Sequence, residues 1–566
     1  MTKKAFEYKR IEPVETLKKM LDSAVSKVGD QVLYKYRDKK DIKEVTYKEF
    51  QYTTFCLGTG LASLGLASEH VACTGENSYP WICVYLTMMQ ATGVFVPIDK
   101  ELPLDDVINI ANDSDSKAIF YASKFEEDFK ANKERFNNIK YFIGFDREED
   151  EGEFLSFNKL IEKGKKLLES GDKTFTDMET DHYGLKLLVY TSGTTGNPKG
   201  VMLSEHNLVS SVYYGLQVSQ PETMELAVLP LHHTYEAVPG ILVGIHHHST
   251  TCINSKLTMV LKNIQEFKPD YLYLVPAFVE LFYKKIWAAA RESGKDKALK
   301  FLIKFSNALM KFGIDKRREL FKSIIDSFGG NLKTIICGGA PVRAELGYFF
   351  DSIGIYLMNG YGITECSPLV AVNNRNYNDC TTVGFPLPCL ELKFDNINDD
   401  GIGEICVKGD VVMMGYYKQP EKTEEALKDG WFYTGDYGRL DKAGRLVITG
   451  RKKNIIVLNN GKNVYPEEIE DYIGSIDYIK EVVVYALLDE HGQQDRLCAE
   501  IYLDSDIIKD NKDPKLKAKL KADIDEKCKE LPRYKQINEV VIRDTEFEKT
   551  TSNKIRRNKV GPNAGK

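Results

Sequence analysis

The chain has 566 residues, of which 43% are apolar and 28% are charged, and its formal net charge is -6. This composition excludes a mainly disordered chain, a collagen-like chain and a coiled coil. The length predicts more than one hydrophobic core, because a single core rarely grows past about 250–300 residues. The acidic balance disfavours a dominant nucleic-acid surface, so no nucleic-acid partner is expected.

Strands and helices alternate along the first two thirds of the chain. Short β-branched or aromatic runs predict strands at residues 118–121, 141–144, 187–190, 271–275 and 334–337. An amphipathic helix is expected over residues 298–312. Strands that alternate with helices predict βαβ units and largely parallel sheets.

The pattern changes after residue 383. Short strands between Gly and Asp turns predict a small β-rich region over residues 383–448. We therefore predict an α/β fold with a large N-terminal domain, residues 1–452, that contains two subdomains with parallel-type sheets and the β-rich region. A mobile, small α+β domain is expected to follow over residues 453–566.

The cysteines and the apolar segments bear on the compartment. The 11 cysteines are scattered without a C-x-x-C pair, which disfavours a disulfide framework or a cysteine zinc site and favours reduced thiols. The first ten residues lack the apolar core of a signal peptide. The most apolar window, residues 81–98, divides into a helical half and a strand, whereas a membrane span needs about 20 continuous apolar residues. We expect a cytoplasmic protein, with peripheral membrane contact left open.

A loop rich in Gly, Ser and Thr follows the apolar run at residues 187–189. Its sequence is Thr191-Ser-Gly-Thr-Thr-Gly-Asn-Pro-Lys-Gly200. Glycines let backbone N–H groups turn inward around an anion, hydroxyl groups add donors, and Lys199 adds a positive charge. The order differs from the G-x-x-x-x-G-K-[ST] pattern, which disfavours a P-loop NTPase. The loop is therefore a candidate phosphate-binding loop.

The same loop resembles the signature loop of the adenylate-forming superfamily, which includes acyl-CoA synthetases, luciferases and the adenylation domains of peptide synthetases. Further segments resemble the other motifs of that family, in its order. They are Cys337-Gly-Gly-Ala-Pro341, Asn359-Gly-Tyr-Gly-Ile-Thr-Glu-Cys366, Tyr433-Thr-Gly-Asp436, Gly450-Arg-Lys-Lys453, the loop Gly461–Ile469 and Lys549-Thr-Thr-Ser-Asn-Lys554-Ile555. The chain is most similar to medium- and long-chain fatty acyl-CoA synthetases.

This resemblance implies a ligase that works in two half-reactions. A fatty acid carboxylate attacks the α-phosphate of ATP and pyrophosphate leaves; the thiol of CoA then attacks the acyl-adenylate and AMP leaves. Both steps concentrate negative charge, so the protein would act by positioning and charge stabilisation. ATP, Mg²⁺ and CoA are the implied cofactor and co-substrates, and fatty acid metabolism is the implied context.

The resemblance also assigns the nucleotide-binding residues. They are Thr191, Ser192, Gly193, Thr194, Thr195, Gly196, Lys199, Gly338, Gly339, Ala340, Pro341, Asn359, Gly360, Tyr361, Gly362, Asp436, Arg451, Lys453 and Lys462. The 191–200 loop would hold the β- and γ-phosphates, and Tyr361 would pack on adenine. Asp436 would accept hydrogen bonds from the ribose hydroxyls, and Arg451 would donate to ribose or phosphate.

Four residues are assigned to catalysis by the same resemblance: Thr364, Glu365, His233 and Lys554. Thr364 would reach the α-phosphate. Glu365 and Thr191 would hold Mg²⁺, a hard cation that takes oxygen ligands. Lys554 would offset the charge that develops at the α-phosphate.

The catalytic lysine has two competitors. The family usually has Gly directly before this lysine, whereas this chain has Asn553. Asn tolerates the left-handed backbone better than most residues, so the turn is expected to survive. Lys549 and Lys559 are the other basic candidates in this segment.

Lys453 falls at the family's hinge motif. The resemblance implies that the C-terminal domain rotates there between the half-reactions, presenting Lys554 first and the 461–465 loop, with Lys462, second. Alternatively, the segment around Lys453 is simply a basic turn between two domains, which fits its composition equally well.

The acyl group is expected near Leu229-Pro-Leu-His-His-Thr-Tyr-Glu236, where His233 fits the family's P-L-x-H position. Tyr235, Val238 and Gly240 are further pocket candidates. No Lys or Arg occurs over residues 202–255 to pair with a charged substrate tail, which favours an unbranched apolar acyl chain. As an alternative, His232 and His233 would ligate a metal with the three histidines at 246–248, although such sites usually include other ligand types.

Other functions share these motifs. An acyl carrier protein presents the same thiol as CoA and is an alternative acceptor. A non-catalytic nucleotide-binding homologue and a luciferase-type oxidation are further alternatives. The sequence sets neither the acyl chain length nor the oligomeric state.

Overall fold

The structure is a computed structural model that describes residues 6–191, 198–459, 462–488, 494–505, 507–508, 510, 513–549 and 555–561. The chain divides into two compact units. Unit 1 contains residues 1–391 and 407–432, and unit 2 contains residues 392–406 and 433–566. These units follow from packing, whereas the predicted division between residues 452 and 453 stays a prediction.

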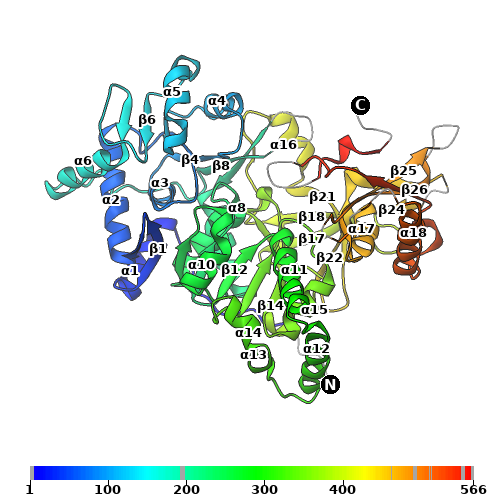
Figure 1. The fold of residues 1–566 in the computed structure, drawn as a ribbon. Coiled ribbons are helices and arrows are strands. Elements are labelled where there is room, and N and C mark those ends of the chain that lie inside the picture. The colour runs from blue at the N-terminus through cyan, green and yellow to red at the C-terminus, as the bar shows by residue number, and fades with distance from the viewer. Residues whose placement is uncertain are drawn as a thin grey trace. The chain divides into compact units, whose positions relative to one another are not determined.

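Unit 1 contains a nine-stranded sheet (Figure 1). Its order is β16 (Phe385–Pro386), β15 (Leu369–Val372), β14 (Tyr356–Gly362), β13 (Thr334–Cys337), β12 (Tyr271–Leu274), β10 (Met224–Ala227), β11 (Thr250–Ile253), β1 (Val32–Asp38) and β2 (Asp41–Thr46). The strands from β14 to β1 run parallel, and β15, β16 and β2 form antiparallel edges. All residues of β12 and β13 are buried, as expected of parallel strands covered on both faces.

A second sheet of unit 1 has eight strands. Its order is β19 (Gly415–Tyr416), β9 (Lys199–Ser204), β8 (Leu185–Thr191), β4 (Val94–Ile98), β3 (His70–Thr74), β5 (Ala118–Tyr121), β6 (Tyr141–Gly144) and β7 (Phe154–Ser156). The strands from β8 to β7 run parallel, whereas β9 and β19 are antiparallel to their neighbours. The β8–β9 hairpin carries the candidate phosphate loop.

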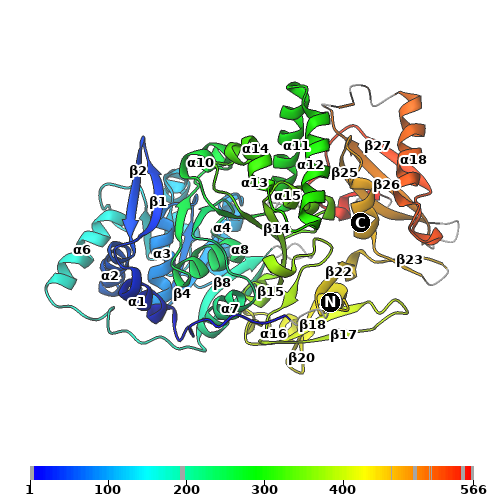
Figure 2. The same cartoon turned by 90° about the horizontal axis from the view of Figure 1, so that it is seen from below.

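Helices connect and cover these two sheets. They are α1 (Leu17–Val28), α2 (Tyr47–Ser63), α3 (Tyr79–Gln90), α4 (Leu104–Asp113), α5 (Glu126–Asn132), α6 (Phe157–Glu169), α7 (Glu205–Val218), α8 (Thr234–Glu236), α9 (Val243–His246), α10 (Val260–Phe267), α11 (Pro276–Glu292), α12 (Asp296–Lys311), α13 (Arg317–Leu320), α14 (Lys322–Ser327), α15 (Ala344–Ser352) and α16 (Pro420–Ala426). Helices α10 to α15 gather on one side of the nine-stranded sheet (Figure 2). One apolar core joins them to β10–β14, with buried members such as Leu272, Phe282, Ile325 and Phe350.

Five strands form a third sheet, as the β-rich pattern predicts. They are β17 (Leu390–Asp395), β18 (Gly403–Gly409), β21 (Trp431–Leu440), β20 (Leu427–Lys428) and β22 (Leu446–Arg451). In unit 2 the later elements are β23 (Ile456–Val457), β24 (Asn463–Val464), α17 (Pro466–Gly474), β25 (Ile479–Leu488), β26 (Gln494–Leu503), α18 (Pro514–Cys528) and β27 (Glu539–Arg543). Strands β25–β27 share an apolar core with α17 and α18, so this segment is a small α+β fold.

The predicted α/β fold is confirmed, with two largely parallel sheets, a β-rich sheet and a small α+β segment. The apolar window at residues 81–98 is indeed a helix, α3, followed by a strand, β4. The predicted helix at residues 298–312 is α12. Within the described residues, no helix is both long and apolar enough to cross a membrane. All 11 cysteines carry free thiols.

Candidate active site

The β8–β9 hairpin places two predicted site residues opposite each other. Thr191, the last residue of β8, pairs with Lys199, the first residue of β9. The ladder therefore closes the base of the candidate phosphate loop. The loop residues predicted to bind phosphate (Ser192, Gly193, Thr194, Thr195 and Gly196) lie outside the described residues.

Tyr416 connects this hairpin to the predicted magnesium ligand. Strand β19 pairs with β9, and the Lys199 ammonium lies 4.9 Å from the centre of the Tyr416 ring, a cation–π distance. The Tyr416 hydroxyl donates a hydrogen bond of 2.9 Å to Glu365 Oε1. Burial, and next the charge of Glu365, raise the pKa of the Tyr416 phenol, which keeps the proton that it donates. Lys199 and Glu365, predicted from separate motifs, are thus brought together.

The turn that carries Thr364 and Glu365 is held by the segment before β19. Residues Thr364–Cys366 form one 3-10 turn after β14. The Met413 N–H donates to the Glu365 carbonyl oxygen at 2.8 Å, and the Ser367 hydroxyl donates to the Val411 carbonyl oxygen at 2.9 Å. These contacts fix the direction of the Glu365 side chain toward Tyr416.

Glu365 fits the role of a magnesium ligand. Its side chain is half-buried, and Oε1 accepts the Tyr416 hydrogen bond. Among the described residues, Oε2 takes part in no hydrogen bond or ion pair shown by the structure, which leaves an oxygen for a hard cation.

The predicted adenine turn, Gly338 to Pro341, begins directly after β13. The Gly338 N–H donates to the Leu274 carbonyl oxygen at 3.1 Å. Gly339 has φ +81°, a backbone conformation that favours glycine. A Cβ atom on Gly338 would lie 3.1 Å from the ring of Tyr235, whose hydroxyl donates to the Ile336 carbonyl oxygen at 3.0 Å. Tyr235, predicted to line the acyl pocket, therefore packs against this turn.

The next motif lies at the carboxyl end of the neighbouring strand. Asn359, Gly360, Tyr361 and Gly362 end β14, and Asn359 pairs with Cys337 in the parallel ladder. Ligands of open α/β sheets bind at this end of the strands. The buried Asn359 amide donates to the Cys380 carbonyl oxygen at 3.0 Å, so this nitrogen holds a loop. Its predicted contact with nucleotide stays a prediction.

Asn77, before α3, holds the histidine-containing loop. The Asn77 amide donates to the Leu229 carbonyl oxygen at 2.7 Å, and the Leu231 N–H donates to Asn77 Oδ1 at 3.0 Å. This two-way contact fixes the backbone just before His232 and His233. Sequence analysis assigned Asn77 no role, because nothing local links it to a loop more than 150 positions away.

His232 and His233 pack together. Their ring centres are 4.2 Å apart, and His233 directly precedes α8. His232 is buried, with Nε2 at 3.5 Å from Asp99 Oδ1. Burial, and next the neighbouring His233, lower the pKa of His232, so its ring is neutral at pH 7. In the described ranges, no group of three or more His, Cys, Asp or Glu residues is placed to hold a metal ion.

Two buried acids lie beside this loop, and sequence analysis missed them. Glu225 is in β10 and Glu236 ends α8; both are fully buried. Glu236 Oε2 accepts from the Leu229 N–H at 3.1 Å. A Cβ atom on Gly240 would lie 2.9 Å from Glu236 Oε1 and 3.0 Å from Glu225 Oε1, so this glycine makes room for both acids. Burial raises the pKa of each carboxyl group.

Unit 2 brings together the two residues predicted to contact ribose. Asp436 of β21 pairs with Arg451 of β22, and Arg451 Nε lies 3.0 Å from Asp436 Oδ1. The Asp436 N–H donates to Thr434 Oγ1 at 3.1 Å. Asp436 is buried, whereas Arg451 is exposed and adds charge at the surface. The pair therefore presents a carboxylate and a guanidinium at one hairpin.

Lys453 and Lys462 lie near this hairpin in the sequence of unit 2. Lys453 is in the 3-10 turn Lys452–Asn454 that follows β22. Lys462 precedes β24, and its carbonyl oxygen accepts from the Leu458 N–H at 3.0 Å. Both side chains are exposed.

Lys554 lies outside the described residues, but its competitors do not. Lys549 and Ile555 form a β-bridge on either side of the segment. Lys549 Nζ lies 2.5 Å from Glu481 and 3.3 Å from Glu546. Lys559 Nζ lies 3.3 Å from Glu548. Both competitors are ion-paired, and the assignment of Lys554 stays a prediction.

Comparison with known families matches both parts of the chain. Residues 21–417 match the family described as AMP-binding enzyme, and residues 453–562 match the AMP-binding enzyme C-terminal domain. A long-chain-fatty-acid–CoA ligase of Mycobacterium bovis, FadD15, is 30% identical over 470 residues, which cover 78% of this chain and 75% of the relative. Long-chain-fatty-acid–CoA ligase 1 of Homo sapiens is 26% identical, covering 78% of this chain and 67% of that protein.

Solved structures share the fold. The anthranilate CoA ligase AuaEII, in complex with anthranoyl-AMP, superposes with a TM-score of 0.76 at 19% identity and covers 97% of both chains. ATP-bound MatB from Rhodopseudomonas palustris gives a TM-score of 0.73 at 22% identity, covering 96% of this chain and 97% of that chain. At these identities the likeness concerns the fold alone.

Proposed function

The chain belongs to the AMP-binding enzymes, and on this premise we propose that it is an ATP-dependent fatty acid:CoA ligase that forms an acyl-adenylate and then an acyl-thioester. The names of the relatives support a long-chain fatty acid as substrate. The contact series Lys199–Tyr416–Glu365 carries the proposal. It joins the hairpin that carries the phosphate loop to the carboxylate expected to bind Mg²⁺.

Unit 1 supplies groups for the triphosphate. Lys199 contributes a positive charge at the base of the phosphate loop, and Tyr416 orients Glu365 by donating to Oε1. Glu365 and Thr191 would hold Mg²⁺, which when bound offsets charge on the phosphate oxygens. Thr364, in the same turn as Glu365, would direct its hydroxyl to the α-phosphate. The result is positioning of the phosphates for in-line attack.

Unit 2 supplies groups for the ribose and for the transition state. The buried Asp436 carboxylate would accept hydrogen bonds from the ribose hydroxyls, and Arg451 would keep this carboxylate oriented. Lys554 would stabilise the charge that develops at the α-phosphate. His232, which is neutral, and His233 would mark where the acyl carboxylate enters. The hydrogen bonds of Asn77 fix the backbone directly before both histidines.

A substrate panel tests this proposal. Carboxylic acids of graded length are supplied with ATP and Mg²⁺, with either CoA or an acyl carrier protein, and AMP formation is measured. We expect AMP with long apolar acids and CoA. AMP formation only with the carrier protein would assign that acceptor instead. If none of the acids causes pyrophosphate release, the chain would be a nucleotide-binding protein without ligase activity.

The lysine assignment has its own test. In Lys554→Ala we expect adenylation to fall by at least about 10²-fold, as removal of one electrostatic contact to a transition state does. Thioester formation from supplied acyl-adenylate should be largely retained. Lys559→Ala is the matched control, because Lys559 already pairs with Glu548. Loss of adenylation in the control but not in Lys554→Ala would exchange the two assignments.

The hinge at Lys453 remains part of the proposal. If rotation at this residue separates the half-reactions, Lys453→Pro should slow thioester formation more than adenylation, because proline restricts its own φ and the residue before it. Single-turnover measurements of each step give the comparison. Equal loss of both steps would contradict the hinge. We also propose peripheral contact with a membrane, where long-chain acids dissolve.

A further inference from the structure

The outer face of α12 carries aromatic side chains in contact with solvent. Phe301 is 66% exposed and Phe305 is 44% exposed. They lie one turn apart and their rings are parallel, with centres 6.3 Å apart. Phe312, directly after the helix, is 82% exposed and continues the same face, because residues i, i+4 and i+11 align on a helix. Exposed aromatic clusters of this kind mark interaction surfaces.

A row of lysines flanks these phenylalanines. Lys297, Lys300, Lys304 and Lys311 are all exposed and recur at helical spacing beside the aromatic face. In the described residues, the structure shows no ion pair between any of these lysines and a carboxylate. Asp296 is the one acidic residue of α12. The row is therefore a local cationic surface on a chain whose net charge is -6.

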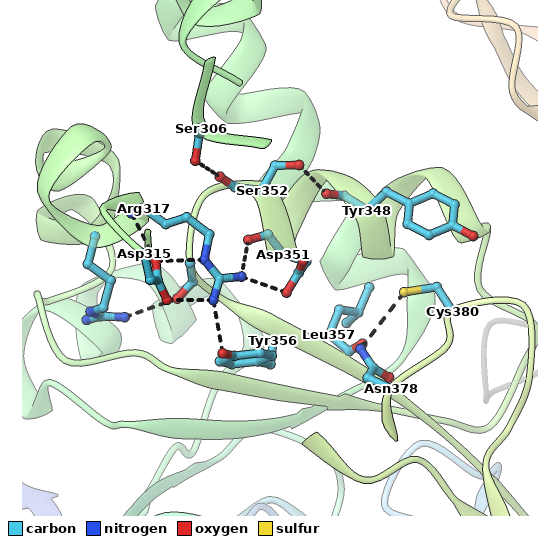
Figure 3. A network of polar contacts seen from close by, with 12 residues as sticks. Ser306, Asp315, Arg317, Tyr348, Asp351, Ser352, Tyr356, Leu357, Asn378 and Cys380 are labelled. Atoms are coloured by element: carbon cyan, nitrogen blue, oxygen red, sulfur yellow. Dashed lines mark hydrogen bonds and ion pairs between the residues drawn. The ribbon is translucent and has the colours of Figure 1, made fainter. Parts of the chain in front are cut away.

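The opposite face of α12 is firmly attached to unit 1. Leu299 belongs to the core shared with the nine-stranded sheet, and the Ser306 hydroxyl donates to the Ser352 carbonyl oxygen at 3.3 Å. Figure 3 shows Ser306 and Ser352 side by side above the Arg317 network. The helix is thus held by one face, and the aromatic face is left outward.

The segment that follows α12 is fixed as well. The buried Arg317 guanidinium contacts both oxygens of Asp315, at 3.0 and 2.8 Å, and Asp351 Oδ1 at 2.9 Å (Figure 3). Its Nη2 also donates to the Tyr356 hydroxyl at 3.0 Å. Asp315 is thus paired with Arg317, and the structure shows no ion pair between Asp315 and a lysine of the row.

An apolar cavity adjoins α12. It has a volume of about 570 Å³, within the usual range of ligand sites. Its walls include Ala298, Leu299 and Leu302 of α12 and Phe282, Ile286 and Ala289 of α11. The cavity lining includes none of Phe301, Phe305 and Phe312, so the cavity is separate from the aromatic face.

We propose that the outer face of α12, made of Phe301, Phe305, Phe312 and the four lysines, docks on an anionic phospholipid surface. Aromatic residues beside a lysine row on an amphipathic helix are the features by which helices lie in a membrane interface. Each lysine near an anionic surface contributes attraction, and the rings bury apolar area. The inference rests on the proposed ligase function for its purpose, since docking brings the enzyme to membrane-dissolved fatty acid.

Vesicle co-sedimentation of the full chain tests the proposal, using phosphatidylcholine vesicles with and without phosphatidylglycerol. We expect stronger binding to the anionic vesicles, weakened by salt. Lys297→Gln, Lys304→Gln and Lys311→Gln together should lower the partition coefficient at least tenfold, since each lysine contributes about fivefold. Phe301→Ser with Phe305→Ser should lower it at least tenfold on both vesicle types.

The control replaces three exposed lysines of α6, Lys163, Lys165 and Lys166, by Gln, and should bind as the wild type does. Thermal unfolding, and AMP formation with a long-chain acid supplied without vesicles, should be unchanged in all variants. Equal binding to the two vesicle types, or unchanged binding of the α12 variants, would overturn the proposal. A dimer that forms without vesicles and is lost in the Phe301→Ser, Phe305→Ser variant would also overturn the proposal. In that case the face would bind a second copy of the chain. Vesicle binding without ligase activity would retain this inference and reject the proposed function.

Discussion

Acidic side chains occupy two opposite environments in unit 1. Glu365 is half-buried and accepts a hydrogen bond from Tyr416, whose ring contacts the Lys199 ammonium. Glu225 and Glu236 are fully buried against each other around Gly240, and burial raises the pKa of both. The first environment is suited to a carboxylate that binds a cation, and the second to carboxyl groups that keep their protons.

The difference separates an acidic residue proposed to serve the reaction from two acidic residues buried in the core. A buried carboxylate without a cationic partner is costly, so the pair is expected to remain protonated at neutral pH. Glu365 avoids that cost because it is only half-buried and accepts a hydrogen bond from the Tyr416 hydroxyl. Substitutions in the two places should therefore affect different measurements.

Glu365→Gln is expected to give the largest effect. Adenylation, measured as pyrophosphate release, should fall by about 10²–10³-fold, because the substitution removes charge that the phosphates and Mg²⁺ require. The free energy of unfolding should change by less than about 0.5 kcal/mol, as for other substitutions outside the core. Glu424→Gln, on the exposed side of α16, is the matched control. A large loss of stability with normal adenylation would remove Glu365 from the site.

Tyr416→Phe should give an intermediate effect. The ring under Lys199 remains, but the hydrogen bond to Glu365 is lost, which should lower adenylation about tenfold, since hydrogen bonds to charged groups contribute more than neutral ones. The dependence on Mg²⁺ concentration should shift to higher values. In the neighbouring control Tyr417→Phe, the lost hydroxyl donates to Asp115 instead. Equal losses in both variants would mean that the Glu365 contact has no special role.

Glu225→Gln should raise the free energy of unfolding at alkaline pH and change it little at acidic pH. The pKa of Glu225 in the fold lies above its ordinary value of 4.5, so the stability that its protonated form contributes is fully present below that value and is lost as pH rises through the raised pKa. Because Gln does not titrate, the variant should lose the part of the pH dependence of stability that Glu225 contributes. At about pH 8.5 the free energy of unfolding of the variant should be higher than that of the wild type by about 1 kcal/mol, since one pKa unit corresponds to about 1.4 kcal/mol.

Urea unfolding at several pH values measures this difference. Glu292→Gln, on the exposed part of α11, should leave the slope unchanged. A Glu225→Gln variant that is less stable than the wild type at every pH would show that the pair is ionised and compensated by a partner, and the contrast with Glu365 would disappear.

Much of the fold followed from local patterns. The strands at residues 118–121, 141–144 and 334–337 coincide with β5, β6 and β13, because short β-branched runs between turns are typical of buried parallel strands. The predicted helix over residues 298–312 is α12. Its periodicity indicated an amphipathic helix but not that Phe301 and Phe305 lie outside, since pattern alone assigns phenylalanine to the core.

The candidate site was predicted in its chemistry but not in its contacts. Lys199, Glu365, Asp436 and Arg451 were identified from motifs of the family, each from residues adjacent in the chain. Tyr416 was missed because its importance arises from the pairing of β19 with β9, more than 200 positions earlier in the chain. The acid pair was missed because Glu225 and Glu236 meet only when β10 and α8 are folded.

The sequence by itself therefore determined the class of fold, the order of the motifs and the kinds of group available to bind a triphosphate, because these depend on short-range spacing and residue chemistry. Only the tertiary structure decided that Tyr416 joins Lys199 to Glu365, that two acids share a buried space beside Gly240, and which face of α12 meets solvent. Those outcomes depend on strand register and packing between distant segments, which set burial and partnership for each side chain.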